Sequence, residues 1–102
     1  MVTLYAVIVA TRADYYDYKR AHPEHDQNQL TWFKQQEEAG TLLACGPFAP
    51  HDGTGLWILE ASSLAEAQRI VGSSPRSQDG MLAESARIVE WEAHIGKHRF
   101  LH

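Results

Sequence analysis

Two histidines stand on either side of a proline in the stretch "RAHPEHDQNQLTW", which covers residues 20–32. The imidazole of histidine gains and loses a proton near neutral pH, so histidine is well suited to acid–base catalysis. His22 and His25 are a poor metal pair, because Pro23 interrupts the helix between them and no third ligand is evident. We therefore predict that His25 transfers protons and that no metal is bound. The alternative is a pair of solvated histidines at the entrance to a helix.

Tyrosines and arginines precede the histidines in the segment 11–25. Tyr15 and Tyr18 could cover a pocket and hydrogen-bond a hydroxylated ring, while Arg12 could hold an anionic oxygen. Packing at an interface, or solubility in the case of arginine, is the alternative explanation for these residue types. We expect the substrate-binding residues of this region to be His22, Tyr15, Tyr18 and Arg12.

Other candidates for chemistry carry weaker signals. Cys45 is the only cysteine, so the chain has no internal disulfide or thiolate cluster, and its apolar neighbours predict an inert thiol. His51 falls in a turn, where we expect it to be solvated. The sequence Gly53-Thr54-Gly55 precedes no helix, so it does not predict a phosphate-binding loop. These observations therefore give no sign of a thiolate cluster or a phosphate-binding loop.

The hydrophobic pattern predicts four strands and two helices around these residues. The strands are expected at 2–10, 41–49, 56–61 and 84–93, and the helices at about 26–40 and 64–71. Leu30 and Phe33, with Trp32, supply the apolar stripe of the first helix, and a single helical turn can follow Pro75. The order β-α-β-β-α-β predicts an α+β, ferredoxin-like fold: a four-stranded antiparallel sheet with both helices on one face.

The face of the sheet opposite the helices also carries apolar residues and needs a cover. The chain is 102 residues long, and we expect one domain over residues 1–95 with a short tail at 96–102. Because this domain has no further helix for the open face, a second copy of the sheet is the economical cover. We therefore predict a homodimer that closes a dimeric α+β barrel.

The composition argues against nucleic acids and membranes as partners and favours small molecules. The formal charge is −4 and the nine basic residues are scattered, so a nucleic-acid partner is not expected. The apolar run "LYAVIVA" is too short to span a bilayer and predicts a buried strand instead of a membrane anchor. With a single cysteine, the chain fits a reducing cytoplasm.

Several motifs together resemble the YCII-related family of small dimeric α+β barrel proteins. They are "HPEH", "EAGTLLACGPFAP", "LEASSLAEAQRIV" and "MLAESARIVEW", and they span residues 2 to about 95 in the family's order. The resemblance implies a pocket at the end of the sheet in each subunit and a histidine–aspartate dyad. Relatives in this family include an enzyme that eliminates HCl from a chlorinated hydroxyhydroquinone.

The resemblance also nominates the two members of the dyad. "HPEH" points to His25 as the family histidine, whereas an alignment that holds the helix rigid up to Gly40 points to Gln29. Where the family usually has Asp-Pro after the second helix, this chain has Ser74 before a proline, and either Asp79 or Asp26 could replace the missing carboxylate.

The resulting hypothesis is a small cofactor-free lyase of the dehydrohalogenase type. It would use histidine acid–base chemistry on a hydroxylated, in one version chlorinated, aromatic or cyclic catabolite, with His25, Asp79 and Ser74 as the catalytic group. Three alternatives stay open: a dimeric metabolite-binding or accessory module without catalysis, an enzyme similar to muconolactone isomerase, and a haem- or quinone-handling monooxygenase on the same barrel architecture.

Overall fold

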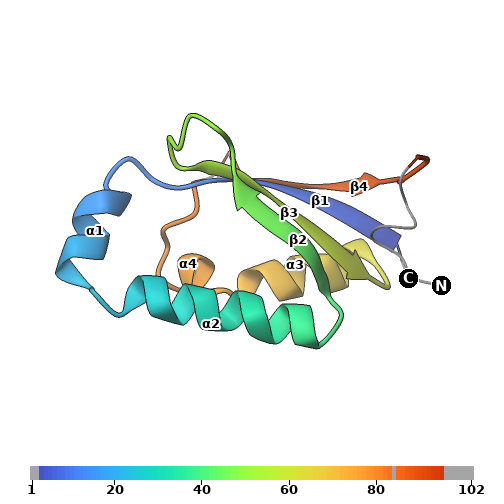
Figure 1. Cartoon of the computed structure of the whole chain (residues 1–102), viewed down its shortest axis with the longest axis horizontal. Coiled ribbons are helices and arrows are strands. Elements are labelled where there is room, and N and C mark those ends of the chain that lie inside the picture. The colour runs from blue at the N-terminus through green and yellow to red at the C-terminus, as the bar shows by residue number, and fades with distance from the viewer. Residues whose placement is uncertain (1–2, 84, 96–102) are drawn as a thin grey trace.

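The structure is a computed structural model that describes residues 3–83 and 85–95. Its elements run in the order β1 Thr3–Ala10, α1 Tyr15–Ala21, α2 His25–Glu38, β2 Leu42–Pro47, β3 Thr54–Ala61, α3 Leu64–Gly72, α4 Pro75–Gln78 and β4 Arg87–Trp91. Figure 1 shows the sheet as one layer and the helices α2, α3 and α4 as a second layer beneath it.

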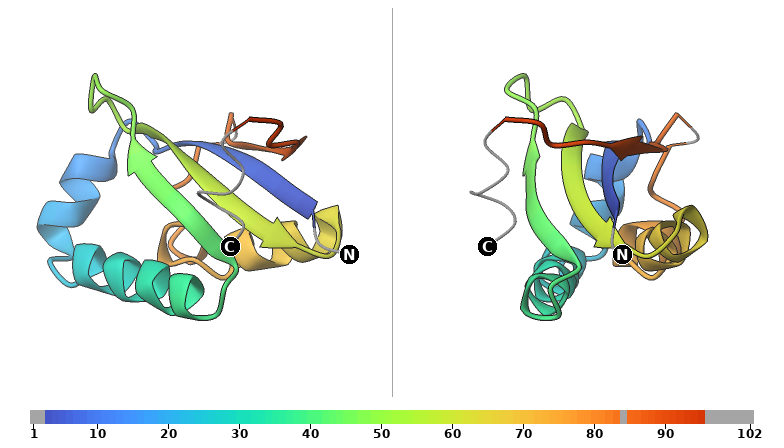
Figure 2. Two further views of the ribbon diagram at one scale, coloured as in Figure 1. Left: turned by 45° about the vertical axis from the view of Figure 1, so that its right-hand side comes forward. Right: turned by 90° about the vertical axis from the view of Figure 1, so that its right-hand side faces the viewer.

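The four strands form one sheet in the order β2-β3-β1-β4, with every neighbouring pair antiparallel. In the register of the central strand, Val7 lies opposite Trp57 on β3 and opposite Ile88 on β4. The two further views in Figure 2 show that α2 and α3 lie on the same face of the sheet. The predicted α+β ferredoxin-like fold is therefore confirmed.

The hydrophobic core lies between the sheet and these helices. It contains Tyr5, Val7, Val9, Trp32, Leu42, Trp57, Leu59, Ala61, Ala67 and Ile70. The rings of Trp32 and Phe33 on α2 pack against Trp57 with centroid distances of 5.4 and 5.2 Å. The prediction that Leu30 belongs to this stripe is wrong, because its side chain is 45% exposed. The buried side of α2 includes His25, Gln29 and Trp32, and Leu30 lies off that side.

The segment before α2 contains a helix that the sequence pattern did not predict. α1 ends at Ala21, and the chain turns through Pro23 before α2 begins at His25. The three tyrosines and the aspartate of α1 are weak helix formers, so local propensity gives little sign of this helix. The break at the proline places α1 across the end of the sheet, beside the loop between β2 and β3 (Figure 1).

Two further expectations concern residues that the structure does not describe. The predicted tail at 96–102 lies outside them, as does residue 84, the predicted start of the fourth strand. Among the described residues, no helix combines the length and the apolar character needed to cross a membrane.

Candidate active site

His25 is buried at the first turn of α2, with a partner on each ring nitrogen. Its side chain is 1% exposed, Nδ1 lies 3.0 Å from Oδ2 of Asp79, and Nε2 lies 3.0 Å from the hydroxyl of Tyr15. Asp79 comes from the end of α4, 54 positions away, and Tyr15 comes from the start of α1, 10 positions away. The ring is therefore held in a single orientation.

The chemistry of the partners sets the direction of these hydrogen bonds. An ionised carboxylate only accepts, so Nδ1–H of His25 donates to Asp79, and a neutral imidazole then accepts at Nε2 from Tyr15 O–H. The guanidinium of Arg76 only donates, and its Nε lies 3.0 Å from the same hydroxyl oxygen. The four groups thus form a directed chain in which Arg76 donates to Tyr15, Tyr15 to His25, and His25 to Asp79.

A second donor, Tyr18, also reaches Asp79. The hydrogen bond to the Asp79 carboxylate raises the pKa of Tyr18 to about 12, because ionising the phenol would place two negative charges side by side. The same bond, together with His25, lowers the pKa of Asp79 below its ordinary value. Asp79 is therefore ionised at neutral pH and acts as the acceptor for both side chains.

The raised pKa of Tyr18 predicts a distinct step in an alkaline titration. The chain has four tyrosines, and tyrosinate absorbance should include one component that ionises near pH 12. Because the folded-state pKa of Tyr18 is above its ordinary value, its contribution to stability is complete below pH 10 and is lost between about pH 10 and 12.

The Tyr18→Phe variant should lack this late component and keep the others. Asp79→Asn should move it back toward the ordinary range, because the carboxylate that causes the shift is gone. An unchanged titration in Asp79→Asn would contradict the pairing of Tyr18 with Asp79.

The short helix α4 brings Arg76 and Asp79 to the site. Ser74 is fully buried and caps this helix, since its Oγ accepts a hydrogen bond of 3.2 Å from the backbone N–H of Ser77. The Oε1 of Gln29, one turn after His25 on the buried side of α2, accepts a 3.0 Å bond from the backbone N–H of Arg76. Ser74 and Gln29 therefore both hold the N-terminal end of α4 in place.

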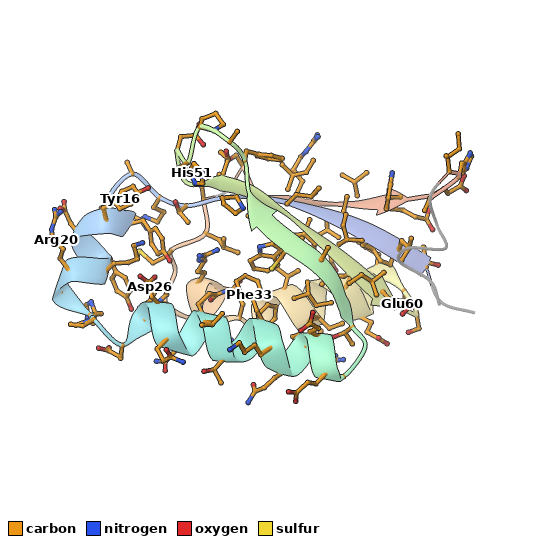
Figure 3. All side chains as sticks on the ribbon, in the orientation of Figure 1. Tyr16, Arg20, Asp26, Phe33, His51 and Glu60 are labelled. Atoms are coloured by element: carbon orange, nitrogen blue, oxygen red, sulfur yellow. The ribbon has the colours of Figure 1, made fainter. Side chains whose placement is uncertain are left out.

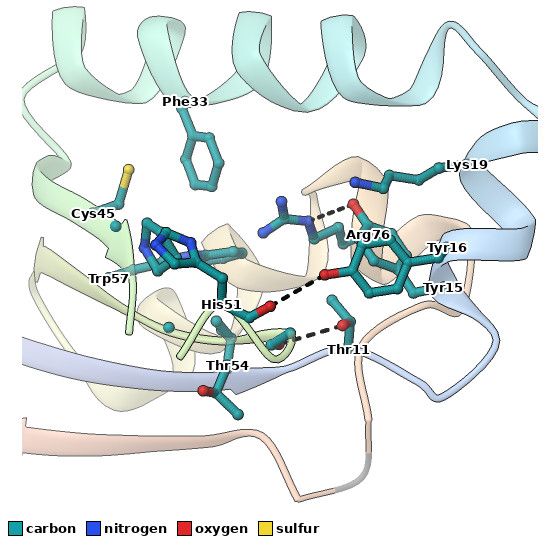
Figure 4. Close-up of a pocket in the computed structure, with 15 residues that line it drawn as sticks. Thr11, Tyr15, Tyr16, Lys19, Phe33, Cys45, His51, Thr54, Trp57 and Arg76 are labelled. Atoms are coloured by element: carbon teal, nitrogen blue, oxygen red, sulfur yellow. Dashed lines mark hydrogen bonds between the residues drawn. The ribbon is translucent and has the colours of Figure 1, made fainter. Parts of the chain in front are cut away.

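A cavity of about 380 Å³ lies between α1, α2 and the adjacent ends of β2 and β3. Tyr15 and Arg76 line it, whereas His25 is not among the described residues that do. Figure 4 shows the hydroxyl of Tyr15 bonded to Arg76 inside this space, with Phe33 and Trp57 on other walls. The group that can meet a ligand is therefore the Tyr15 phenol, and His25 lies behind it.

The structure places the other predicted ligand-binding residues away from this cavity. Arg12 forms an ion pair with Asp14 and is more than half exposed. His22 stacks on Tyr18 with a centroid distance of 4.2 Å, on the outer side of the dyad. Asp26, the alternative carboxylate, lies on the surface with one oxygen 3.7 Å from Nζ of Lys19.

Cys45 and His51 both line the cavity, and His51 is exposed in the loop between β2 and β3, where a solvated turn was expected. Cys45 is exposed, so the expectation that apolar neighbours enclose it is wrong, whereas the inertness of its thiol stays a prediction. Partial burial still raises the pKa of its thiol, and Arg76 offsets part of that shift. The carbonyl of His51 accepts a bond of 3.3 Å from the hydroxyl of Tyr16, which lies on α1 beside the loop (Figure 3).

Sequence reasoning missed Arg76 and Lys19 as cavity residues. Only the spacing of three residues between Arg76 and Asp79 hints that both belong to one helical turn. Within residues 3–83 and 85–95, no group of three His, Cys, Asp or Glu side chains could hold a metal ion.

The family model of the YCII-related domain matches residues 3–92. The chain belongs to the YCII-related domain family. No curated protein sequence matches this family member significantly.

Two solved structures are similar to this YCII-related chain. One is a 5-chloro-2-hydroxyhydroquinone dehydrochlorinase from Burkholderia phenoliruptrix AC1100 in complex with 2,5-dihydroxybenzoquinone; the TM-score is 0.71 at 17% identity, over 93% of this chain and 97% of that one. The other is assigned as an antibiotic biosynthesis monooxygenase from Bacteroides thetaiotaomicron VPI-5482, with a TM-score of 0.59 at 5% identity, over 92% and 90% of the two chains. At these identities the likeness establishes the fold.

Proposed function

We propose that this chain is a cofactor-free enzyme that moves protons to and from a small hydroxylated ring. The observation that carries the proposal is the position of His25, whose two ring nitrogens join Asp79 to the cavity-lining hydroxyl of Tyr15. A buried histidine held between a carboxylate and a phenol has the parts of an acid–base relay. We infer that Tyr15 exchanges the proton with substrate, while His25 and Asp79 act behind it.

The hydrogen bonds at Tyr15 suggest how the relay works. Its oxygen accepts from Arg76 and donates to His25, which leaves one lone pair for a substrate hydroxyl. When that hydroxyl passes its proton to Tyr15, the original phenolic proton moves to Nε2 of His25. The resulting imidazolium is stabilised by Asp79, and reversal of the same steps returns the proton to the substrate.

Elimination of HCl from a chlorinated hydroxyhydroquinone fits this relay. One hydroxyl loses its proton and becomes a carbonyl, and a proton adds to the ring carbon that bears chlorine. The C–Cl bond then breaks, chloride leaves with the bonding electrons, and a second hydroxyl loses its proton. The products are a hydroxybenzoquinone and HCl, so no oxidant is needed. The similar dehydrochlorinase structure, which holds a dihydroxybenzoquinone, supports this class of substrate.

Chloride release tests the proposal. With 5-chloro-2-hydroxyhydroquinone we expect the protein to produce chloride and hydroxybenzoquinone in equal amounts. His25→Gln should lower the rate by about 10²- to 10⁴-fold, the usual contribution of a positioned acid–base group. Arg69→Gln, a change on the exposed side of α3, is the control.

Each negative result has a distinct meaning. Chloride release that is no faster than in buffer would contradict the proposed dehydrochlorinase activity. Tight binding of the substrate without turnover would favour the binding-module alternative. Full activity in His25→Gln would exclude the relay.

We also infer that a second copy of the chain covers the open face of the sheet. On this face Val89 lies opposite Ala6, and Ala6 lies opposite Ile58. Phe48, Leu56 and Ile58 line an apolar groove there, while Val89 and Phe48 are 41% and 39% exposed. This apolar surface lies on the face of the sheet opposite the described helices, so it favours a sheet-to-sheet homodimer.

A charge on this face should separate the two copies. We expect sedimentation analysis to give a dimer for the wild type and a monomer for Val89→Lys. Leu30→Lys, which changes an exposed leucine on α2, should remain dimeric. A wild-type monomer at micromolar concentration, or a dimeric Val89→Lys, would contradict the inference.

We expect the enzyme to act in a reducing cytoplasm. Its single cysteine, Cys45, can form no disulfide within the chain. Fractionation of cells that produce the protein would test this expectation, and recovery from an oxidising compartment would contradict it.

A further inference from the structure

The cavity carries positive charge beyond the single Arg76 N–H that bonds to Tyr15 in the proposed relay. Lys19 and Arg76 both line it, and the described residues around it include no aspartate or glutamate. This contrasts with the whole chain, whose formal charge is −4. Two cations that face one partly open cavity favour an anionic ligand, because their charges add within it and the low-dielectric walls weaken screening.

Arg76 is the better placed of the two cations. In the part of the chain that the structure describes, its guanidinium has no carboxylate partner, whereas Lys19 reaches Asp26 at 3.7 Å. Only Nε of Arg76 is used, in the bond to Tyr15. Figure 4 shows the rest of the guanidinium pointing into the cavity, so its terminal nitrogens are available for a two-point bond to an oxyanion.

The walls of the cavity favour a flat ring as the body of that anion. Phe33 and Trp57 form an aromatic wall, and Tyr15 and Tyr16 lie on the α1 side. The guanidinium carbon of Arg76 lies 5.8 Å from the Phe33 ring centre and 5.5 Å from that of Tyr15. A volume of about 380 Å³ is at the small end of ligand pockets, which suits a molecule with one ring.

We propose that the cavity binds a planar, single-ring organic oxyanion and that Arg76 is its specificity-determining residue. The inference deepens the proposed function and rests on it for the later chemistry: the substrate would be held as a ring phenolate or enolate, with a second ring oxygen at Tyr15. Because Arg76 also bonds to Tyr15, anion recognition and the proton relay meet at one hydroxyl.

A pair of matched ligands tests the charge requirement without any turnover. 4-Nitrophenol can ionise and its anion absorbs visible light, whereas 4-nitroanisole has the same ring with a methyl cap. We expect calorimetry to give clearly tighter binding of the phenol, and absorbance to show that the bound phenol ionises at a lower pH than the free one. Equal affinities for the two ligands would overturn the proposal.

Variants of Arg76 assign the effect to one side chain. Arg76→Gln should weaken 4-nitrophenolate binding by about 10- to 100-fold, as expected for loss of a charge-assisted hydrogen bond. It should also abolish the shift in ionisation of the probe. Arg76→Lys should restore part of both effects, which excludes loss of folding as the cause, and Arg69→Gln should bind like wild type.

The failure of this inference is distinguishable from failure of the proposed function. His25→Gln should lose catalysis but still bind 4-nitrophenolate, because Arg76 remains in place. If the wild type binds 4-nitrophenolate but does not catalyse the elimination, the anion site is supported and the proposed enzyme activity is contradicted. Undiminished probe binding in Arg76→Gln would remove the anion site, whatever the catalytic result.

Discussion

Replacing Tyr15 with phenylalanine is expected to lower the rate of the proposed elimination by about 10²- to 10⁴-fold. The change removes one oxygen atom and keeps the aromatic ring on the cavity wall. It disconnects Nε2 of His25 from the cavity and leaves the Nε–H of Arg76 without its acceptor. Because the ring and the cations stay, KM should change much less than kcat.

Steady-state measurements of chloride release on both proteins test this expectation. Tyr16→Phe is the matched control, since Tyr16 lines the same cavity but its hydroxyl bonds to the carbonyl of His51. We expect less than a tenfold effect from it, in keeping with a net hydrogen-bond contribution of about 1 kcal/mol. A Tyr15→Phe enzyme with wild-type kcat would show that the phenol takes no part in the reaction.

Asp79→Asn is expected to lower the rate by a similar factor, about 10²- to 10⁴-fold. The reason is that it changes which ring nitrogen of His25 carries the proton. The Asp79 carboxylate can only accept, so it keeps the proton on Nδ1 and leaves Nε2 as an acceptor for Tyr15. An asparagine amide can donate to Nδ1 instead, which favours the tautomer with hydrogen on Nε2. That tautomer cannot take the proton of Tyr15. The variant also lacks the negative charge of the carboxylate, which stabilises an imidazolium.

The pH dependence separates this role from a general loss of stability. Since the pKa of Asp79 is lowered in the folded protein, its contribution to stability is present above its ordinary pKa and is lost as pH falls through the lowered value. Urea unfolding should therefore be less sensitive to acid in Asp79→Asn than in wild type. Full activity in this variant, with the late tyrosine component still present, would contradict the arrangement around Asp79.

Most of the fold was predictable because its determinants are local in the sequence. The apolar runs that became β1 and β3 mark their strands within a few residues, and Ser63, whose Oγ accepts a bond from the backbone N–H of Glu66, marks the start of α3. α1 was not predictable in this way, because its helical state comes with packing of Tyr15 into the site, which no short-range pattern reports. The exposed position of Leu30 also follows from which side of α2 meets the sheet.

The site was only partly predictable because its contacts join distant segments. The proline–histidine motif identified His25, and Asp79 was one of two candidate carboxylates for it. The choice among these depends on a contact across 54 positions, and the link from Arg76 to Tyr15 spans 61. The sequence also could not reveal that Tyr15 separates the imidazole from the cavity, which changes the group expected to touch substrate.

The most direct test of the central claim is a crystal structure of the protein with 2,5-dihydroxybenzoquinone. The relay predicts a ring oxygen about 2.6–3.2 Å from the Tyr15 hydroxyl, a second oxygen at the terminal nitrogens of Arg76, and His25 bonded to Tyr15 behind them. A ring bound at another surface, with the hydroxyl of Tyr15 untouched, would contradict the account.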